Sequence, residues 1–415
     1  MANESLFTQA LGLQKPWKVL KSEMIPNSKT NKMEMHIYIG WTDGAKFPCP
    51  EGDEAECSCY DQLEERTWRH LNFFQYKCFI HARTPRIKCN KHGVKAVRVP
   101  WARPRSGFTL LMDGFILELA RHMAIKTIAD EIGETDTRIW RVIELYVRDA
   151  YEKLDFKAIS RIGVDEYSHR GHNYITVFMT KNKESNKSCV LFVTLGKGID
   201  TVNEFSKKFI EKGGIKEDVL VVTSDMTHGF RNAMKSEFTN SKVVVDKFHV
   251  VKMMNDGVDK VRRREASEGK IEKKTKYIWL KNPEDLTEHQ QNTCNRLSKQ
   301  KLGTGRAYRM RLELQAIYAE CLTKDEARVR IMKLTRWMLL SRLEEMRKVA
   351  KSLRRNMEEI INYFTYRTTN AMLEGTNSVI SLVKRRARGF RNMNHFRDMI
   401  YLQSAGLDLP CVKLG

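Results

Sequence analysis

Short, nearly continuous apolar runs in the middle of the chain predict buried strands. Three of them, Ala158–Asp165, Asp218–Asp225 and Lys242–Asp246, each end on an aspartate. Runs of about four to eight such residues are typical of strands that are covered on both faces of a sheet. Between the first two runs lie Tyr174–Met179 and Cys189–Leu195, which are predicted to pair as a hairpin.

The sequence on both sides of these strands has a different pattern. Phe108–Leu154 carries apolar residues at helical spacing, and the stretch from about Val250 to Ile360 is helical in pattern and very rich in Lys, Arg and Glu. Residues 1–45 mix short apolar runs with turns, which indicates a β-rich start. The middle strands are therefore expected to be flanked by at least one helical domain on each side.

Composition narrows the class of protein. The chain has 415 residues, 41% of them hydrophobic, which is enough for several packed cores. No stretch approaches the ~20 apolar residues of a membrane span, and Met1–Ala10 lacks the layout of a signal peptide, so we expect a cytoplasmic protein without a membrane partner. The net charge of +22 favours polyanions, because neutralised phosphates release condensed counterions. Nucleic acid is the expected partner.

Asp165 and Asp225 each end a predicted strand, and open α/β sheets place their chemistry at such ends. Two carboxylates on neighbouring strands repel one another unless a cation lies between them. Mg²⁺ prefers hard oxygen ligands of this kind. An aspartate at a strand end also commonly caps the next helix, and for either residue alone that structural role is the stronger interpretation.

Glu374 supplies a third carboxylate. A helix predicted from about Arg367 to Arg388 is apolar on one half. Glu374 lies on the other half, and Arg367, Asn370, Arg385 and Arg388 share its face. An ordinary solvated face is the alternative, but an acid flanked by arginines and amides suits a metal ligand beside a phosphate backbone. Two divalent ions about 3.5–4 Å apart activate the attacking oxygen and stabilise the leaving oxygen in phosphodiester cleavage.

Several motifs resemble those of one family. The last third of the chain contains Arg367-Thr-Thr-Asn-Ala-Met-Leu-Glu-Gly-Thr-Asn-Ser378, followed by Lys384-Arg-Arg-Ala-Arg-Gly-Phe-Arg-Asn392. Thr223-Ser-Asp-Met226 and Asp246-Lys-Phe-His-Val-Val-Lys252 complete the pattern. Together they resemble the ISL3 family of insertion-sequence transposases, and the likeness extends over nearly the whole chain.

The resemblance implies a multidomain α+β protein whose ribonuclease-H-like α/β catalytic domain is interrupted by an all-helical insertion. A zinc-finger-like module and a helix-turn-helix precede that domain. It maps a DDE triad onto Asp165, Asp225 and Glu374, with two Mg²⁺ (or Mn²⁺) ions. The expected segments are a β-rich start (1–45), a zinc-finger-like module (46–105), a helix-turn-helix domain (106–155), the first catalytic part (156–250), the helical insertion (251–359) and the last catalytic part (360–415).

The resemblance also implies partners. The expected substrate is double-stranded DNA, both the terminal inverted repeats of the element and the target. A homodimer or higher oligomer on DNA is expected, in a bacterial cytoplasm and associated with the nucleoid. Asp246 and His249 form a D-x-x-H pair that resembles a feature of such enzymes. His249 is expected either to place or protonate a DNA oxygen near the metals, or only to tie the strand end to the insertion, and the two readings carry equal weight.

Cysteines crowd into one early stretch. In a chain without a secretion signal, five of the nine cysteines within residues 49–89 indicate metal binding before disulfides. A structural zinc needs four ligands, and we expect them among Cys49, Cys57, Cys59, Cys89 and His92. In ISL3 relatives this region resembles a zinc finger that opens with Cys-Pro-x-Cys-Gly. Here Glu51 and Gly52 follow Cys49-Pro50, so the second cysteine of that motif is absent and Cys57 or Cys59 has to take its place as a ligand. Cys78 and His81 are rival ligands, and a degenerate finger without metal is the remaining alternative.

A helix-turn-helix is predicted between residues 124 and 143. Ile125, Ile128 and Ile132 space as a first helix, Gly133 suits the turn, and Thr135 or Asp136 can cap the second helix. An ordinary helical hairpin is the alternative, but the basic residues on and around the second helix favour DNA reading. The expected DNA contacts are Lys126, Thr137, Arg138 and Arg141 from this motif, and Arg385 and Arg388 beside Glu374.

The three acids and the helical stretch between them distinguish three possible functions: a transposase, a DNA-binding regulator and another metal-dependent nuclease. A transposase requires all three acids, which a catalytically silent DNA-binding regulator has no reason to keep. A metal-dependent nuclease of another kind is less consistent with the long helical stretch between Asp225 and Glu374. The sequence therefore predicts a DNA transposase that cleaves strands and joins them.

Overall fold

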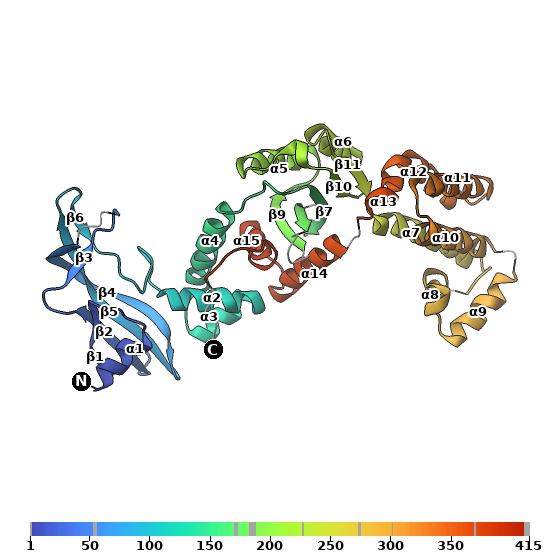
Figure 1. Cartoon of the computed structure of the whole chain (residues 1–415). Coiled ribbons are helices and arrows are strands. Elements are labelled where there is room, and N and C mark those ends of the chain that lie inside the picture. Colours follow the sequence, from blue (N-terminus) through green and yellow to red (C-terminus); the bar gives the residue numbers. More distant parts are fainter. Residues whose placement is uncertain are drawn as a thin grey trace. The chain divides into compact units, whose positions relative to one another are not determined.

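The computed structural model describes residues 2–52, 56–169, 173–181, 188–225, 228–272, 275–300, 302–368 and 371–410. The chain divides into two compact units, residues 1–150 with 408–415, and residues 151–407 (Figure 1). No helix within the described ranges combines the length and the apolar character needed to cross a membrane.

The first unit begins with a six-stranded sheet. Its strands follow the order β1-β2-β5-β4-β3, and β6 pairs with β5. The β2–β5 pair is parallel and the other pairs are antiparallel. The elements are α1 (Ala2–Ala10), β1 (Trp17–Pro26), β2 (Met33–Trp41), β3 (Lys46–Pro48), β4 (Glu56–Phe73), β5 (Tyr76–Cys89) and β6 (Gly93–Ala96).

Residues 1–45 and the cysteine-rich stretch share this sheet. β2 pairs with β5 from Glu34 opposite Lys77 to Ile39 opposite Ala82. Buried aromatic side chains from both stretches pack into one core, in which the ring centroids of Trp17 and Phe47 are 5.4 Å apart. The boundary expected near residue 45 therefore divides a single sheet, because the pairing partner of β2 comes from the cysteine-rich stretch.

Three helices complete the first unit: α2 (Leu110–His122), α3 (Ile125–Ile132) and α4 (Asp136–Glu152). The expected helix, turn and helix are confirmed. Gly133 takes the left-handed conformation, with φ of 68°, that ends α3 and starts the turn.

The second unit contains a five-stranded mixed sheet in the order β11-β10-β7-β8-β9. β7, β10 and β11 run parallel, and the hairpin strands β8 and β9 are antiparallel. The three apolar runs and the hairpin are thus confirmed as strands. The strands are β7 (Arg161–His169), β8 (Asn173–Lys181), β9 (Ser188–Leu195), β10 (Val221–Ser224) and β11 (Lys242–Val245).

Helices cover both faces of this sheet. Figure 1 shows α5 and α6 on one face and α14 and α15 on the other. Their bounds, with the short 3-10 turn η1 before β10, are α5 (Ile199–Glu211), η1 (Lys216–Asp218), α6 (His228–Glu237), α14 (Ala371–Arg386) and α15 (Met393–Ser404).

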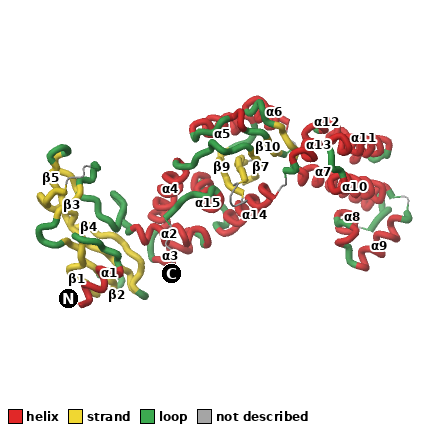
Figure 2. The backbone as a smooth tube through the Cα atoms, viewed as in Figure 1, coloured by secondary structure: helices red, strands yellow, loops and turns green. Residues whose placement is uncertain are grey.

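Between β11 and α14 the described residues fold as helices and loops (Figure 2). Asn362 donates a hydrogen bond of 2.9 Å to the carbonyl oxygen of Val243, which ties the last of these helices to β11. The segment comprises α7 (Lys247–Ser267), α8 (Lys276–Leu280), η2 (Pro283–Asp285), α9 (Glu288–Ser298), α10 (Gly303–Glu320), α11 (Lys324–Leu340), α12 (Glu344–Arg355) and α13 (Met357–Tyr366).

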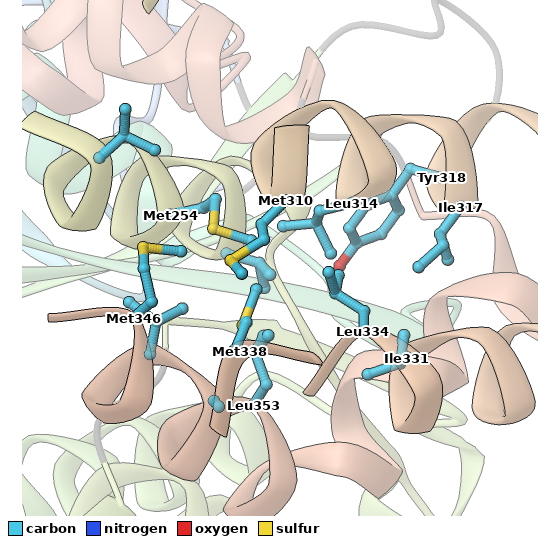
Figure 3. Close-up of a cluster of buried hydrophobic side chains, with 14 of the residues drawn as sticks. Met254, Met310, Leu314, Ile317, Tyr318, Ile331, Leu334, Met338, Met346 and Leu353 are labelled. Carbon is cyan, nitrogen blue, oxygen red and sulfur yellow. The ribbon is translucent and has the colours of Figure 1, made fainter. Parts of the chain in front are cut away.

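The helical segment has its own methionine- and leucine-rich core (Figure 3). Met254 of α7, Met310 of α10, Met338 of α11 and Met346 of α12 are all fully buried in it. The same cluster includes Val244 and Val245 of β11, so one continuous core joins the helices to the edge of the sheet.

This core provides a matched test of stability. Met338 is fully buried and Met332, on the same helix, is 45% exposed. Met338→Ala is expected to lower the free energy of unfolding by about 2–5 kcal/mol, because it removes buried methylenes and leaves a cavity. Met332→Ala should change it by about 0.5 kcal/mol or less. Urea unfolding followed by circular dichroism measures both, and equal losses would contradict the packing of α11.

Candidate active site and metal centres

The register of two parallel strands leads toward Asp165 on β7 and Asp225 just after β10. Val222 of β10 pairs with Ile162 of β7, and Thr223 pairs with Gly163. Continuing that register by two residues sets Asp225 opposite Asp165. Paired residues of parallel strands point to the same face, so the extended register would put both carboxyl groups on one face at this edge of the sheet.

Asp165 lies inside its strand, which corrects the prediction that it ends one. β7 continues to His169 and stays paired with β8, where Asp165 is opposite Val177. β10, in contrast, ends at Ser224. Because β7 extends beyond the end of β10, the part of β7 from Asp165 onward has no β10 residue paired with it, and this is where Asp225 leaves the sheet.

Asp165 is held by two hydrogen bonds. The side-chain amide of Asn377 donates to Oδ2 at 2.9 Å, and the backbone N–H of Glu166 donates to Oδ1 at 2.8 Å. Burial raises the pKa of the Asp165 carboxyl, and these hydrogen bonds oppose the shift. A buried carboxyl of this kind becomes a stable anion when a cation is beside it.

Glu166 adds a carboxyl group that the sequence analysis did not single out. Burial raises its pKa, and the charge of Asp225 raises it further. Glu166 is therefore close enough to Asp225 for the two charges to interact. Only its position next to Asp165 could have indicated it in the sequence. Successive side chains of a strand point to opposite faces, so Glu166 was expected to point away from the face that carries Asp165.

His249 faces the same acids. Its Nδ1 lies 3.1 Å from Oδ2 of Asp246, which is almost fully buried. The hydrogen bond to Asp246 raises the pKa of His249, burial opposes this, and the charges of Asp165 and Asp225 raise it further. Oδ1 of Asp246 also accepts the backbone N–H of Phe248 and caps α7. The D-x-x-H pair thus starts the first helix after β11 and also borders the acids.

Glu374 lies in the first turn of α14. Its side chain is outside the described residues, as is Asn370. One turn further along α14, Asn377 contacts Asp165, so this part of the helix lies over β7. The acid-bearing helix is shorter than predicted, because α13 ends at Tyr366 and α14 begins only at Ala371.

The shorter helix changes the positions of two arginines. Arg367 has a left-handed φ of 45° and donates to the carbonyl oxygen of Cys321 at 2.7 Å, so it secures the link between α10 and α11 and is not on the acid-bearing face. Arg388 lies beyond the end of α14 with φ of 52°. Both Arg385 and Arg388 are exposed to solvent.

A cavity of about 580 Å³ opens beside the acids. Asp225 and His249 line it, and it extends between α7 and α12. Lys252, Lys260 and Lys348 also line it. Asp256 and Glu345 line it as well, so the cavity that reaches Asp225 carries both basic and acidic side chains.

The cysteine region brings three metal-binding groups together. Ligand atoms of Cys49, Cys89 and His92 lie within 4.8 Å of one another. Nδ1 of His92 is 3.5 Å from the sulfur of Cys49 and 3.7 Å from that of Cys89. Two such atoms bound to one tetrahedral zinc are about 3.6 Å apart, given Zn–S and Zn–N bonds of about 2.3 and 2.0–2.1 Å. The three side chains therefore fit a zinc ion.

The other predicted zinc ligands have different surroundings. Cys59 pairs across the sheet with Ile87, and the same register extended by two residues sets Cys57 opposite Cys89. The thiol of Cys59 donates to the carbonyl oxygen of Asp61 at 3.2 Å. Burial raises the pKa of Cys78 to about 11, and His81 lies 2.8 Å from a ring nitrogen of His36.

The helix-turn-helix is anchored at its turn. Lys77 donates to the carbonyl oxygen of Gly133 at 2.7 Å, and Arg69 lies 3.6 Å from Glu134. Arg138 is held within the unit, because it pairs with Glu134 and its guanidinium lies 4.2 Å from the ring centre of Phe108. The remaining predicted contacts are all exposed to solvent: Lys126, Thr137 and Arg141.

Acids gathered on a sheet edge beside an open cavity, in a strongly basic chain that also carries a helix-turn-helix, are typical of enzymes that act on DNA. Comparison with known families makes this specific. Residues 162–400 match the transposase domain of the ISL3 family, residues 97–147 the helix-turn-helix domain of that family, and residues 46–92 the zinc finger of the transposases of IS204, IS1001, IS1096 and IS1165. The chain belongs to the ISL3 family of DDE transposases.

Individual relatives agree with this assignment. The chain is 24% identical over 379 residues to the transposase for insertion sequence element IS1557 of Mycobacterium tuberculosis, which covers 82% of each chain. It is 23% identical over 381 residues to the transposase for insertion sequence element IS1001 of Bordetella parapertussis, which covers 87% of this chain and 89% of the relative. The protein is an enzyme that transposes DNA, and a catalytically silent regulator is not favoured.

The zinc geometry gives a testable expectation. Protein purified without chelator should carry about one zinc per chain, and Cys89→Ser should lose it because thiolate and imidazole ligands bind zinc together. Cys78→Ser, a change of the same kind in the neighbouring part of β5, should keep it. Metal analysis of the three proteins decides this, and zinc retained in Cys89→Ser but lost in Cys78→Ser would reverse the assignment.

Proposed function

We propose that Asp165, Asp225 and Glu374 are the catalytic triad of this transposase and hold two Mg²⁺ or Mn²⁺ ions. The parallel register that sets Asp225 opposite Asp165 carries this proposal. The hydrogen bond from Asn377 to Asp165 supports it, because that contact puts the first turns of α14 beside the two aspartates. Carboxylate oxygens in such a cluster are the ligands that Mg²⁺ prefers.

A ribonuclease-H-like fold with a helical insertion is the architecture that we propose for residues 156–415. Three parallel strands extended by an antiparallel hairpin, with helices on both faces, support it. The helical stretch 251–359 leaves the sheet after β11, and the chain returns to the sheet in α14. The insertion would then separate the first two acids from the third in sequence but not in space.

The chain's own groups divide the chemistry between them. Bound divalent ions supply charge stabilisation at the attacking and leaving oxygens of a phosphodiester. Asp165, Asp225 and Glu374 would hold those ions at the sheet edge. In cleavage, a water oxygen would bond to phosphorus while the bond from phosphorus to the 3′ oxygen breaks; the water loses a proton and the departing 3′ oxygen gains one. In joining, that 3′-hydroxyl would lose its proton and bond to a target phosphorus, while the bond from that phosphorus to the target's own 3′ oxygen breaks and this oxygen takes up a proton. His249, held by Asp246, is placed to give a proton to the departing oxygen or to orient it.

DNA recognition is assigned to the first unit. We propose that Arg141 and Thr137 read base edges from α4, with Lys126 on the backbone, and that Arg138 mainly braces the turn. The terminal inverted repeats of the element are the proposed ligand, bound by a dimer or higher oligomer. Arg385 and Arg388 are proposed to hold phosphates near Glu374.

A structural zinc is proposed to hold the hairpins of the first unit together. Cys49, Cys89 and His92 supply three ligands. Cys57 lies outside that group of three, and it is the proposed fourth ligand because the extended register sets it opposite Cys89. Cys59 is less suited, because its thiol already bonds to a backbone carbonyl.

The triad is tested by neutral variants of nearly the same shape. Asp165→Asn, Asp225→Asn and Glu374→Gln should each reduce cleavage of labelled element ends by about a thousandfold or more, because several kcal/mol of transition-state stabilisation are lost. Binding of the ends should persist, since affinity resides mostly in basic contacts. Asp218→Asn, an exposed aspartate just before β10, is the control. Near-parental cleavage by any triad variant would remove that residue from the triad.

Base reading and phosphate holding are separated by a second test. Arg141→Ala should cost about 1–3 kcal/mol on element ends and narrow the preference over random DNA. Arg388→Ala should weaken both DNAs alike and lower the salt slope by about one unit. Arg148→Ala, an exposed arginine two turns further along α4, is the control for Arg141. Binding titrations at several salt concentrations measure all three, and sequence preference lost in Arg388→Ala but kept in Arg141→Ala would refute the assignment.

A further inference from the structure

Asn377 links two distant parts of the chain at the active site. Its side-chain nitrogen donates a 2.9 Å hydrogen bond to Oδ2 of Asp165, across 212 residues of sequence. The donor lies on α14 and the acceptor lies inside β7. This one contact therefore joins the helix that carries Glu374 to the strand that carries Asp165.

The position of Asn377 along α14 makes the contact informative. Residues three apart on a helix lie on the same face, about 4.5 Å apart along the axis. Glu374 and Asn377 have that spacing. The hydrogen bond from Asn377 to Asp165, together with the 3.4 Å bond from Lys384 to the carbonyl oxygen of Ser168, consequently limits the rotation and the height of α14 over β7, and with them the place where Glu374 leaves the helix.

The amide oxygen of the same side chain has a second property. Oδ1 of Asn377 is buried, and it has no hydrogen-bond partner among the described residues. Its orientation is set by Asp165, because a flipped amide would turn an oxygen toward a carboxylate oxygen. A buried acceptor without a partner calls for an explanation, and a bound water or ion is a common one.

We infer that Asn377 is a positioning residue of the catalytic site. Its N–H holds Asp165 and ties α14 to β7, and its buried Oδ1 would accept a hydrogen bond from a water on a metal ion bound by the triad. Mg²⁺ keeps several of its waters when proteins bind it, so such donors are available. This inference rests on the triad proposed above.

The side chain is well matched to both tasks. An aspartate at 377 would put a second negative charge against Asp165 and could not donate to it. A leucine has nearly the shape of asparagine but offers neither the donor nor the acceptor. Partners that orient metal ligands typically contribute 10–100-fold to metal affinity.

The test measures metal binding without catalysis. Mn²⁺ is titrated into the full-length protein, and the free ion is followed by electron paramagnetic resonance. Asn377→Leu should weaken Mn²⁺ binding by about 10–100-fold, while element-end binding and thermal melting stay near those of the parent. Ser381→Ala, an exposed change one turn further along α14, should bind Mn²⁺ like the parent. Cleavage by Asn377→Leu should recover in part as Mn²⁺ is raised, which a purely structural defect would not do.

A smaller variant guards against misfolding. If Asn377→Leu melts well below the parent, Asn377→Ser provides the same measurement with less steric change. Parental Mn²⁺ affinity in a folded Asn377 variant would overturn the inference. Asp165→Asn separates this outcome from failure of the triad: if it also binds Mn²⁺ like the parent, the proposed triad is wrong, and if it loses Mn²⁺ while Asn377→Leu does not, only the role of Asn377 is wrong.

Discussion

The parallel pairing of β7 with β10 is the constraint on which the rest of the structure depends. Extended by two residues, its register sets Asp225 opposite Asp165, and burial already raises the pKa of the Asp165 carboxyl. Two carboxylates so close together are unfavourable unless a cation lies between them. The sheet is stable through its apolar neighbours, and in the function proposed above it would hold these acids where a divalent ion binds.

The helical segment between β11 and α14 is tied to the sheet at both of its ends. Asp246 follows β11, caps α7 and holds His249 beside the acids, so the exit from the sheet is itself part of the site. Two hydrogen bonds hold the chain where it comes back to the sheet after the helical segment. Asn362 bonds to β11 from α13, and Asn377 bonds to Asp165 from α14. A core shared between the helices and β11 keeps these two ties consistent with one another.

Much of this arrangement could be predicted from the sequence, because apolar runs mark buried strands directly. The runs before Asp165, Asp225 and Asp246 all became strands. The second half of β7 was missed, since Tyr167-Ser168-His169 are not apolar and their strand conformation comes from pairing with β8. The break at Arg367 was missed for the opposite reason: the helical spacing of residues continues through a turn that only the left-handed φ of Arg367 reveals.

Some residues of the candidate sites could be predicted from the sequence and others could not. Both Cys89-x-x-His92 and Cys78-x-x-His81 have the spacing of metal ligands, yet only the first pair spans a turn, between β5 and β6. Cys78 and His81 lie within β5, where residues three apart point to opposite faces of the sheet. Asn377 was missed because its partner is far away in sequence, and no local pattern indicates such a contact.

The central claim is that the β7–β10 register and α14 together build a divalent-metal site. Crystals of the full-length protein with Mn²⁺, measured at a wavelength where manganese scatters anomalously, test this most directly. The account predicts anomalous density between the carboxyl groups of Asp165 and Asp225, with Glu374 at its border. Manganese bound elsewhere in the chain, with none between those two aspartates, would contradict it.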